Sequence, residues 1–269
     1  MKIKANAKIN LFLDVLGKRK DGYHNIKTIF QEVSLSDDIF IMGTVPNGLF
    51  PNGIKILCDM PGVPTDKKNL VYKAVELLEK HCGIKKAVEI KIKKKIPVGA
   101  GLGGGSSDAA AVLIGLNKLW NLKLHKNQLA KIGKKIGADV PFFTYGGGRC
   151  LGEGIGDKLT PLKVRKTEWY VLVIPPYQIS TKFVYSRLAE TKKSDILNKH
   201  FNRLEDVVLP LYPEIKKIKD LLIESGAEFS LMSGSGSCVF GLVKNKLTGE
   251  KIKNKMKKDG YAVWLVKSI

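Results

Sequence analysis

Hydrophobic and polar residues alternate along the first part of the chain, which is the pattern of strands with one buried face. In residues 7–17 apolar side chains recur at every second position. Short runs with strand character follow at residues 26–35, 38–43 and 54–58, and glycine and proline indicate a turn over residues 45–53. This part of the chain is therefore predicted to form a series of strands.

Helical periodicity begins after these strands. Residues 70–82 place their apolar side chains on one face of a helix, which predicts a helix that ends at Cys82. Asn69 directly precedes this helix, and asparagine is a favoured N-cap. Residues 86–96 then alternate apolar and charged positions, which predicts a strand with one solvated face. A further helix is predicted over residues 126–137, and Pro141 breaks the periodicity after it.

Residues 97–110, PVGAGLGGGSSDAA, place five glycines and two serines between that strand and an alanine-rich helical pattern. Ser106, Ser107 or Asp108 is predicted to cap the helix. The predicted apolar face of the helix comprises Ala109, Val112, Leu113, Leu116 and Trp120. Because glycine allows close approach to the backbone and a helix N-terminus attracts anions, the segment predicts a phosphate site.

The common phosphate motifs do not match this segment as it stands. No lysine follows the glycines, as a Walker loop requires. Gly99, Gly101 and Gly104 match the dinucleotide fingerprint only loosely, since another helix follows. A flexible linker is the weaker interpretation, because linkers rarely lead into an amphipathic helix. A second loop, LMSGSGSCVFGLV at residues 231–243, is equally compatible with a hairpin turn and with a functional role.

The pattern of the sequence changes after residue 157, and a domain boundary is predicted near residues 158–168. A buried strand is predicted from residue 169, and strands and helices alternate from there onward. The pattern predicts an α+β protein in two lobes, with domains over residues 1–160 and 161–269.

Composition excludes several classes of protein. Of the 269 residues 44% are hydrophobic, and no apolar run approaches 20 residues, so we expect a soluble protein without a membrane partner. The first residues lack the apolar core of a signal peptide, which favours the cytoplasm. The four cysteines and four histidines are dispersed, so neither a zinc site nor a disulfide framework is expected, and the cysteines are predicted to be small buried residues.

The formal net charge of +21 raises the possibility of an RNA-binding protein. The basic residues are spread over both halves of the chain, however, and most are lysines on predicted outer helix faces. A solvated surface is therefore the preferred interpretation, and no nucleic-acid partner is predicted.

Three stretches together resemble the GHMP kinases, the superfamily of galactokinase, homoserine kinase, mevalonate kinase and phosphomevalonate kinase. They are AKINLFL at residues 7–13, the glycine-rich segment at 97–110 and SGSGSCVFGL at 233–242. The resemblance implies an ATP-dependent kinase with an N-terminal lobe of the ribosomal protein S5 domain 2-like type. It also implies a ferredoxin-like C-terminal lobe.

Other stretches resemble one branch of that superfamily, which phosphorylates the 2-hydroxyl of 4-diphosphocytidyl-2-C-methyl-D-erythritol in non-mevalonate isoprenoid biosynthesis. DGYH at residues 21–24, GADVPFF at 137–143 and ISTKFVYS at 179–186 carry this resemblance. A homoserine or mevalonate-type kinase is the alternative within the superfamily. Its acceptor has no cytosine to stack, so the first and last of these motifs favour the cytidine compound.

The resemblance implies that Asp139 is the general base and that Lys8 lies beside it. A carboxylate next to an ammonium group stays ionised, and phosphoryl transfer needs a cation near the transferred group. The alternative is structural: Asp139 caps a turn before Pro141, and Lys8 lies on an edge strand.

ATP contacts are likewise implied by the resemblance, with the phosphates wrapped by the glycine-rich segment and with Asn69 and Lys95 near the adenosine. The implied ATP-binding residues are Asn69, Lys95, Pro97, Gly99, Gly101, Gly103, Gly104, Gly105, Ser106 and Ser107. Mg²⁺ is expected as the second cofactor. Ser107 or Asp108 is in a position to assist it, but phosphates and water can supply most of its ligands, so no metal ligand is assigned.

The implied partner is a small molecule with a cytidine diphosphate group. Tyr23 and Tyr185 match stacking positions for cytosine, and His24 matches the residue that reads the edge of the base. Asn10 and Thr181 match contacts to the diphosphate or erythritol portion. Stacking suits any base, so hydrogen bonds must select cytosine. Without the resemblance, Tyr23 is equally an exposed turn residue and Tyr185 a helix residue packed on the core.

Overall fold

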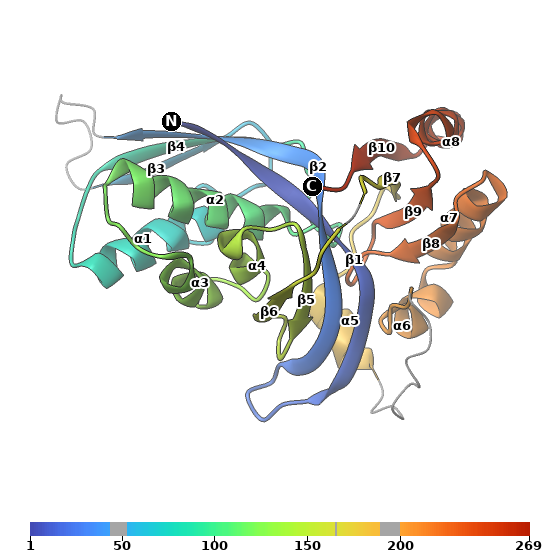
Figure 1. Cartoon of the computed structure of the whole chain (residues 1–269), viewed down its shortest axis with the longest axis horizontal. Helices are drawn as coiled ribbons and strands as arrows, with labels where there is room; N and C mark the ends of the chain where they lie inside the picture. The colour runs from blue at the N-terminus through green and yellow to red at the C-terminus, as the bar shows by residue number, and fades with distance from the viewer. Residues whose placement is uncertain (44–52, 165, 189–199) are drawn as a thin grey trace. The chain divides into compact units, whose positions relative to one another are not determined.

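The structure, a computed structural model, describes residues 1–43, 53–164, 166–188 and 200–269. The chain forms two compact units, each assembled from separate stretches (Figure 1). The first unit comprises residues 1–7, 36–97 and 103–147, and the second comprises residues 8–35, 98–102 and 148–269. Apart from residue 53, the turn predicted over residues 45–53 lies outside the described residues.

Strands and helices alternate along most of the chain. The strands are β1 (Lys2–Lys18), β2 (His24–Gly43), β3 (Ile54–Cys58), β4 (Val88–Lys93), β5 (Arg149–Glu153), β6 (Lys158–Pro161), β7 (Trp169–Ile174), β8 (Phe229–Met232), β9 (Val239–Val243) and β10 (Ala262–Lys267). The helices are α1 (Leu70–Cys82), α2 (Gly104–Leu119), α3 (Lys126–Lys134), α4 (Val140–Tyr145), α5 (Thr181–Arg187), α6 (Glu205–Leu211), α7 (Pro213–Glu224) and α8 (Lys246–Lys258).

The first unit packs its helices on a small sheet. Strand β4 pairs in parallel with β3 and antiparallel with the second part of β2. Helix α2 approaches this sheet closely at Gly115, where a Cβ atom would lie 2.4 Å from the side chain of Ile41 and 2.6 Å from that of Ile3. Helix α1 packs against α2, and α3 packs against α4. Figure 1 shows α1 and α2 on the same face of these strands.

The two strands predicted over residues 26–35 and 38–43 are one continuous strand, β2, so the predicted break is wrong. Ser36 and Asp37 resemble turn residues in the sequence, but both are buried within the strand. The carboxylate of Asp37 is hydrogen-bonded by groups that follow β4, which allows an aspartate to occupy a strand interior.

The predicted cap of α2 is also wrong. The helix begins at Gly104, its N-cap is Gly103 in the left-handed region at φ 69°, and no side chain caps it. Ser107 and Asp108 lie inside the helix and are buried. Because glycines can adopt both the left-handed and the helical conformation, the helix begins three to five residues before the position that side-chain capping by Ser106, Ser107 or Asp108 would give.

Other helix predictions are confirmed with small changes. Asn69 caps α1, since its Oδ1 atom accepts a hydrogen bond from the backbone N–H of Val71 at 2.8 Å. Helix α3 ends at Lys134, short of the predicted Gly137. Pro141 does not end a helix but lies in the first turn of α4, where a missing N–H costs nothing.

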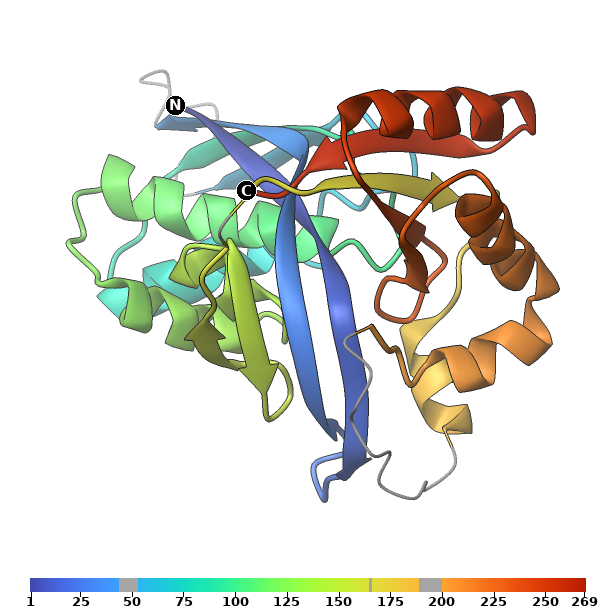
Figure 2. The same cartoon turned by 45° about the vertical axis from the view of Figure 1, so that its right-hand side comes forward.

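The second unit contains a four-stranded antiparallel sheet in the order β10-β7-β9-β8. In chain order this is 4-1-3-2, the arrangement of a ferredoxin-like β-α-β-β-α-β fold. Buried side chains of α7 and α8, among them Ile218 and Met256, share one core with Val171 and Val239 of the sheet. Figure 2 shows α8 running alongside β10. The first part of β2 pairs with β5, which pairs with β6. The predicted α+β class and the buried strand from residue 169 are confirmed.

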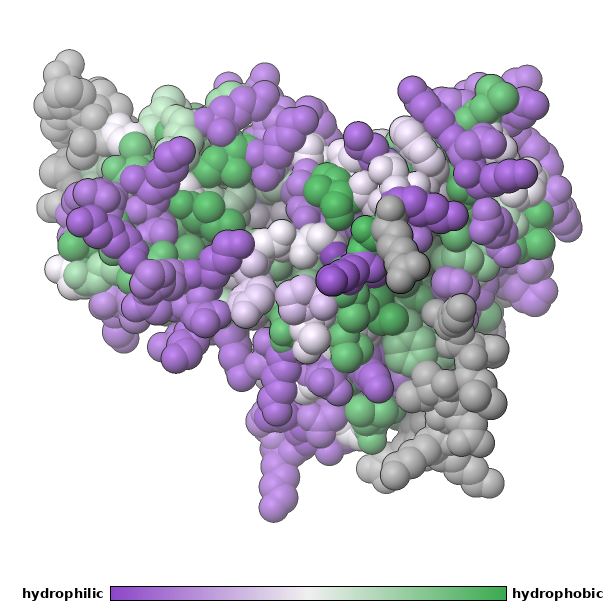
Figure 3. Space-filling view, viewed as in Figure 1, coloured by the Kyte–Doolittle hydropathy of each residue, from purple (hydrophilic) through white to green (hydrophobic). Residues whose placement is uncertain are grey.

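Hydrophilic side chains are spread over the face shown in Figure 3 rather than gathered in one patch. Of the described helices, none has the length and apolar character needed to cross a bilayer. Cys150 and Cys238 are buried as predicted, whereas Cys58 and Cys82 are half-buried.

Two adjacent residues of α2 allow the core of the first unit to be tested. Leu113 is fully buried, whereas Ile114 is 40% exposed. We expect Leu113→Ala to lower the free energy of unfolding by about 2–5 kcal/mol, because it removes packed atoms and leaves a cavity. Ile114→Ala is expected to cost less than about 1 kcal/mol. Chemical denaturation of both variants measures the difference, and equal losses would contradict the packing described here.

Candidate functional site

Residues 98–102 of the glycine-rich segment contact the second glycine-serine loop, residues 233–238. Both stretches belong to the second unit. The backbone N–H of Cys238 donates to the carbonyl of Ala100 at 3.2 Å. The hydroxyl of Ser233 donates to the carbonyl of Gly101 at 3.1 Å. A Cβ atom on Gly101, which has φ of 75°, would lie 2.1 Å from the carbonyl oxygen of Ser233. Only glycine fits this position.

The remaining glycines form the start of α2 in the first unit. Gly103 is the N-cap, and its carbonyl accepts the N–H of Ser107 at 2.9 Å, which closes the first turn. No side chain caps the backbone N–H groups of this turn. These donors and the positive end of the helix dipole can bind a phosphate group.

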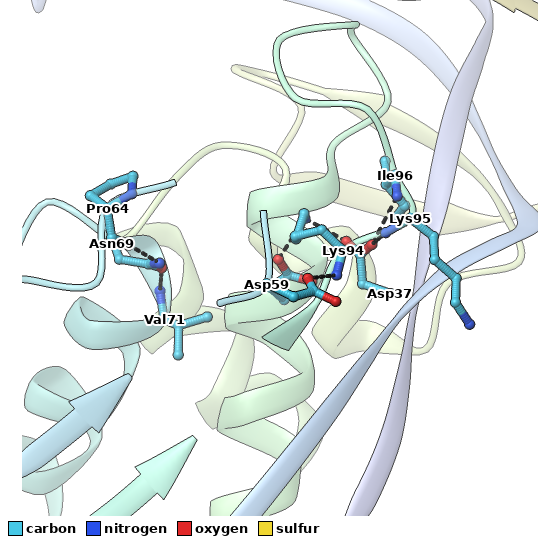
Figure 4. Close-up of polar contacts among 9 residues, drawn as sticks. Asp37, Asp59, Pro64, Asn69, Val71, Lys94, Lys95 and Ile96 are labelled. Atoms are coloured by element: carbon cyan, nitrogen blue, oxygen red, sulfur yellow. Dashed lines mark hydrogen bonds and ion pairs between the residues drawn. The ribbon is translucent and has the colours of Figure 1, made fainter. Parts of the chain in front are cut away.

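Three buried charged side chains, those of Asp37, Lys94 and Asp108, lie at the start of α2, and Figure 4 labels the first two of them. The ammonium group of Lys94 contacts Asp37 Oδ2 at 2.5 Å and Asp108 Oδ2 at 2.8 Å. Asp37 Oδ1 accepts the backbone N–H groups of Lys95 at 2.5 Å and Ile96 at 2.8 Å. We call Asp37, Lys94 and Asp108 the Lys94 cluster. It connects β2, the end of β4 and the first turns of α2.

Burial and charge shift the pKa values in the Lys94 cluster. Burial lowers the pKa of Lys94, but Asp108 and Asp37 raise it above its ordinary value, so the ammonium stays charged. Burial and, to a lesser degree, the charge of Asp37 raise the pKa of Asp108 to about 7, against the opposing effect of Lys94. One ammonium group cannot compensate two buried carboxylates fully.

A chain of buried hydrogen bonds fixes Lys8 on β1. The ammonium of Lys8 donates to Asn10 Oδ1 at 2.8 Å, and Asn10 Nδ2 donates to Thr28 Oγ1 at 2.8 Å. The Thr28 hydroxyl in turn donates to the carbonyl of Phe12 at 2.7 Å. The backbone N–H of Lys8 also donates to the carbonyl of Leu102 at 3.0 Å, which ties β1 to the glycine-rich segment.

The second glycine-serine loop, residues 233–238, lies beside these groups. A Cβ atom on Gly234 would lie 3.4 Å from Asn10 Oδ1 and 3.7 Å from Lys8 Nζ. Ser235 Oγ and Thr181 Oγ1 are 2.7 Å apart and share a hydrogen bond. The buried amide of Asn202 donates to the carbonyls of Gly234 and of Met232, both at 2.7 Å, and so fixes the loop conformation.

Aromatic residues of the second unit gather near the start of β2. The rings of His24 and Tyr185 have centroids 5.1 Å apart with a tilt of 35°. Burial, and to a lesser degree the charge of Lys18, lowers the pKa of His24, which favours the neutral ring. Tyr23 is 58% exposed in the turn before β2. An exposed ring and a half-buried pair can receive a planar ligand.

Other predicted residues have their own local partners. Asn69 uses its Nδ2 atom to donate to the carbonyl of Pro64 at 2.6 Å while its Oδ1 atom caps α1. Lys95 is 56% exposed and pairs with Asp38 at 2.9 Å. Asp139 is the N-cap residue of α4, but its side chain makes no capping hydrogen bond.

The structure brings together Lys8 with Asn10, His24 with Tyr185, and Gly101 with the second loop. Asp139 belongs to the first unit and Lys8 to the second, so their pairing stays a prediction. Sequence reasoning missed the Lys94 cluster and Asn202. Lys94 stands between two other lysines, and no sequence signal distinguishes it from them.

Comparison with known proteins identifies the family. Residues 69–147 match the model of the GHMP kinases N terminal domain, and residues 187–262 match that of the GHMP kinases C terminal domain. The chain is 42% identical to the 4-diphosphocytidyl-2-C-methyl-D-erythritol kinase of Clostridium botulinum (strain Alaska E43 / Type E3), with all of both chains covered. The chain belongs to the GHMP kinases.

Further relatives agree with this GHMP kinase assignment. The 4-diphosphocytidyl-2-C-methyl-D-erythritol kinase of Bacillus cereus (strain AH187) is 43% identical, over 95% of this chain and 92% of its own. A crystal structure of 4-(cytidine 5'-diphospho)-2C-methyl-D-erythritol kinase matches 100% of this chain and 99% of its own, with 30% identity and a TM-score of 0.84. Homoserine kinase from Cytophaga hutchinsonii, at 20% identity and a TM-score of 0.76 over all of this chain and 94% of its own, shares the fold.

Gly101 provides a test of the contact between the two loops of this GHMP kinase. We expect Gly101→Ala to lower the free energy of unfolding by more than about 3 kcal/mol, because strain at positive φ adds to the overlap with Ser233. Gly260→Ala is the matched control, since Gly260 has φ of 88° but nothing within 4 Å. It should cost about 1–2 kcal/mol. Equal values for the two variants in chemical denaturation would contradict a tight contact at Gly101.

Proposed function

We propose that this protein transfers the γ-phosphate of ATP to the 2-hydroxyl of 4-diphosphocytidyl-2-C-methyl-D-erythritol. The products are the 2-phosphate and ADP, and the reaction belongs to non-mevalonate isoprenoid precursor biosynthesis. The observation that carries the proposal is the full-length similarity, at 42% identity, to a kinase named for this substrate. The contact between His24 and Tyr185, which come from the two motifs that favour a cytidine ligand, supports it.

The phosphates of ATP are proposed to bind to backbone N–H groups at the start of α2. That turn has no side-chain cap, and three successive glycines, Gly103, Gly104 and Gly105, leave its backbone open. The hydroxyls of Ser106 and Ser107 are further donors. Asn69 and Lys95 are proposed to lie near the adenosine, together with Pro97 at the start of the segment. Gly99 and Gly101 allow the main chain to turn.

Asp139 is the proposed general base, which takes the proton from the attacking hydroxyl. Lys8 is the proposed cation that offsets charge on the transferred phosphoryl group. The Asn10 and Thr28 hydrogen bonds hold its ammonium group in one place, so little ordering is needed when the substrate binds. Phosphoryl transfer depends mainly on such positioning.

Mg²⁺ is proposed as a cofactor that neutralises phosphate charge when bound. Within the described residues no group of three acidic, histidine or cysteine side chains forms a cage for a metal ion. Mg²⁺ commonly keeps several waters and binds through substrate phosphates, which suits such a site. The carboxylate of Asp108 is turned to Lys94, so no protein ligand is assigned.

The cytosine ring is proposed to stack on Tyr23 and Tyr185, with His24 reading its edge. A neutral His24 offers one donor and one acceptor to the base. Thr181 and Asn10 are proposed to contact the diphosphate or erythritol portion, and both lie beside the second glycine-serine loop. The proposed partner is thus a small molecule, not a nucleic acid, and the proposed location is the cytoplasm. The domain limits at residues 160 and 161 stay a prediction.

The first experiment is an ADP-release assay with Mg²⁺ and ATP, which offers the cytidine compound, homoserine and mevalonate in parallel. We expect turnover with the cytidine compound alone. Asp139→Asn should lower kcat about 10²–10⁴-fold, because the amide cannot accept the proton. Asp220→Asn, which neutralises an aspartate in a surface ion pair, is the control and should retain activity. Turnover with homoserine or mevalonate would refute the substrate assignment.

Substrate stacking can be tested at Tyr185. We expect Tyr185→Leu to raise KM for the cytidine compound roughly 5–150-fold, which corresponds to the loss of about 1–3 kcal/mol of base stacking. KM for ATP should stay unchanged. Tyr185→Phe keeps the ring and should retain most of the affinity. If both variants behave alike, or if KM for ATP rises as well, Tyr185 does not stack on the base.

A further inference from the structure

We propose that Asp108, acting through Lys94, is a positioning residue for the ATP phosphates. It holds the first turns of α2 against the strands so that the backbone N–H groups of Gly104 and its neighbours keep a fixed geometry. This inference rests on the proposed function, because it concerns the same phosphate site.

The Lys94 cluster joins three elements through one ammonium group (Figure 4). Lys94 reaches β2 through Asp37 and α2 through Asp108, at 2.5 Å and 2.8 Å. Its own backbone N–H donates to Asp59 Oδ1 at 2.9 Å, which fixes the residue at its base as well. The start of α2 is therefore tied to both strands by charged hydrogen bonds, the stronger class of hydrogen bond.

The ammonium group lies directly against the first residue of the helix. A Cβ atom on Gly104 would be 3.3 Å from Lys94 Nζ and 3.0 Å from the side chain of Ile96. A displacement of Lys94 would therefore displace the turn that offers the phosphate donors. Small displacements of positioning groups reduce binding and catalysis strongly.

Lys94 cannot bind phosphate as a free cation. Its side chain is only 3% exposed and already pairs with two carboxylates. Lys95, by contrast, is 56% exposed. The cluster carries one ammonium and two carboxylates, so it adds no positive charge to the site. Its contribution to phosphate binding is geometric.

The cluster is also poorly suited to stabilising the fold alone. Asp108 Oδ1 is buried and has no hydrogen-bond partner among the described residues. A buried polar atom without a partner costs free energy, and apolar side chains often replace buried ion pairs without loss of stability. A role in placing the turn explains why charged groups occupy this position.

The test compares Asp108→Ala, Asp108→Ser and Asp108→Asn with Glu89→Ala as the matched control. Glu89 pairs with Lys55 at 2.8 Å in the same unit but away from α2. Alanine is favoured in helices and leaves Lys94 paired with Asp37, and thermal unfolding checks that each variant folds. ADP binding is measured by calorimetry with Mg²⁺ and with EDTA, and KM for each substrate is measured by ADP release.

Asp108→Ala and Asp108→Ser are expected to weaken ADP binding at least tenfold, with and without Mg²⁺. They should raise KM for ATP by a similar factor, while KM for the cytidine compound changes less than twofold. Asp108→Asn keeps the acceptor for Lys94 and should bind ADP within about threefold of the wild type, since a neutral acceptor preserves the hydrogen bond. Glu89→Ala should match the wild type.

Several results would overturn the inference. One is ADP affinity at the wild-type level in Asp108→Ala and Asp108→Ser, and another is ADP binding as weak in Asp108→Asn as in Asp108→Ala. A third is a loss of ADP affinity that appears only in the presence of Mg²⁺. A fourth is an equal loss of ADP affinity in Glu89→Ala. A wild-type protein that binds no ADP would overturn it too. A wild type that binds ADP normally, but does not phosphorylate the cytidine compound, would instead refute the proposed function and leave the inference standing.

Discussion

The buried carboxylate of Asp37 determines where strand β4 ends and where the glycine-rich segment begins. One of its oxygens accepts the backbone N–H groups of Lys95 and Ile96, and the other binds Lys94. The chain can therefore leave the sheet without losing hydrogen bonds. The same contacts place the start of α2, and the proposed phosphate site follows from that placement.

In the second unit the corresponding constraint is the absence of a side chain at Gly101. The carbonyl of Ser233 occupies the space that a Cβ atom would need. Hydrogen bonds from Cys238 and Ser233 to the glycine-rich segment then connect two loops that lie far apart in the sequence. Their shared composition has a packing reason, because small residues permit such close backbone approach.

Sequence reasoning succeeded where the cause of a structure is local. The alternation of Val88, Ile90 and Ile92 predicted β4, and Asn69 predicted the start of α1, because pleat and capping depend on neighbouring residues. It failed at the break predicted between residues 35 and 38, and at the cap of α2. In both places a partner distant in sequence, or glycine's freedom, outweighed the local preference.

The sequence by itself predicted the α+β class, because secondary structure depends on periodicity. Its short motifs, through their resemblance to the GHMP kinases, also implied the family, the ferredoxin-like lobe and the proposed substrate. Only the tertiary structure decided which lysine of the run 93–95 is buried between carboxylates. It also decided that Asn202 holds the second loop and that Thr181 meets Ser235. The three lysines have identical side chains, so only the partners that folding places next to each of them distinguish their roles. Burial strengthens the interaction with those partners.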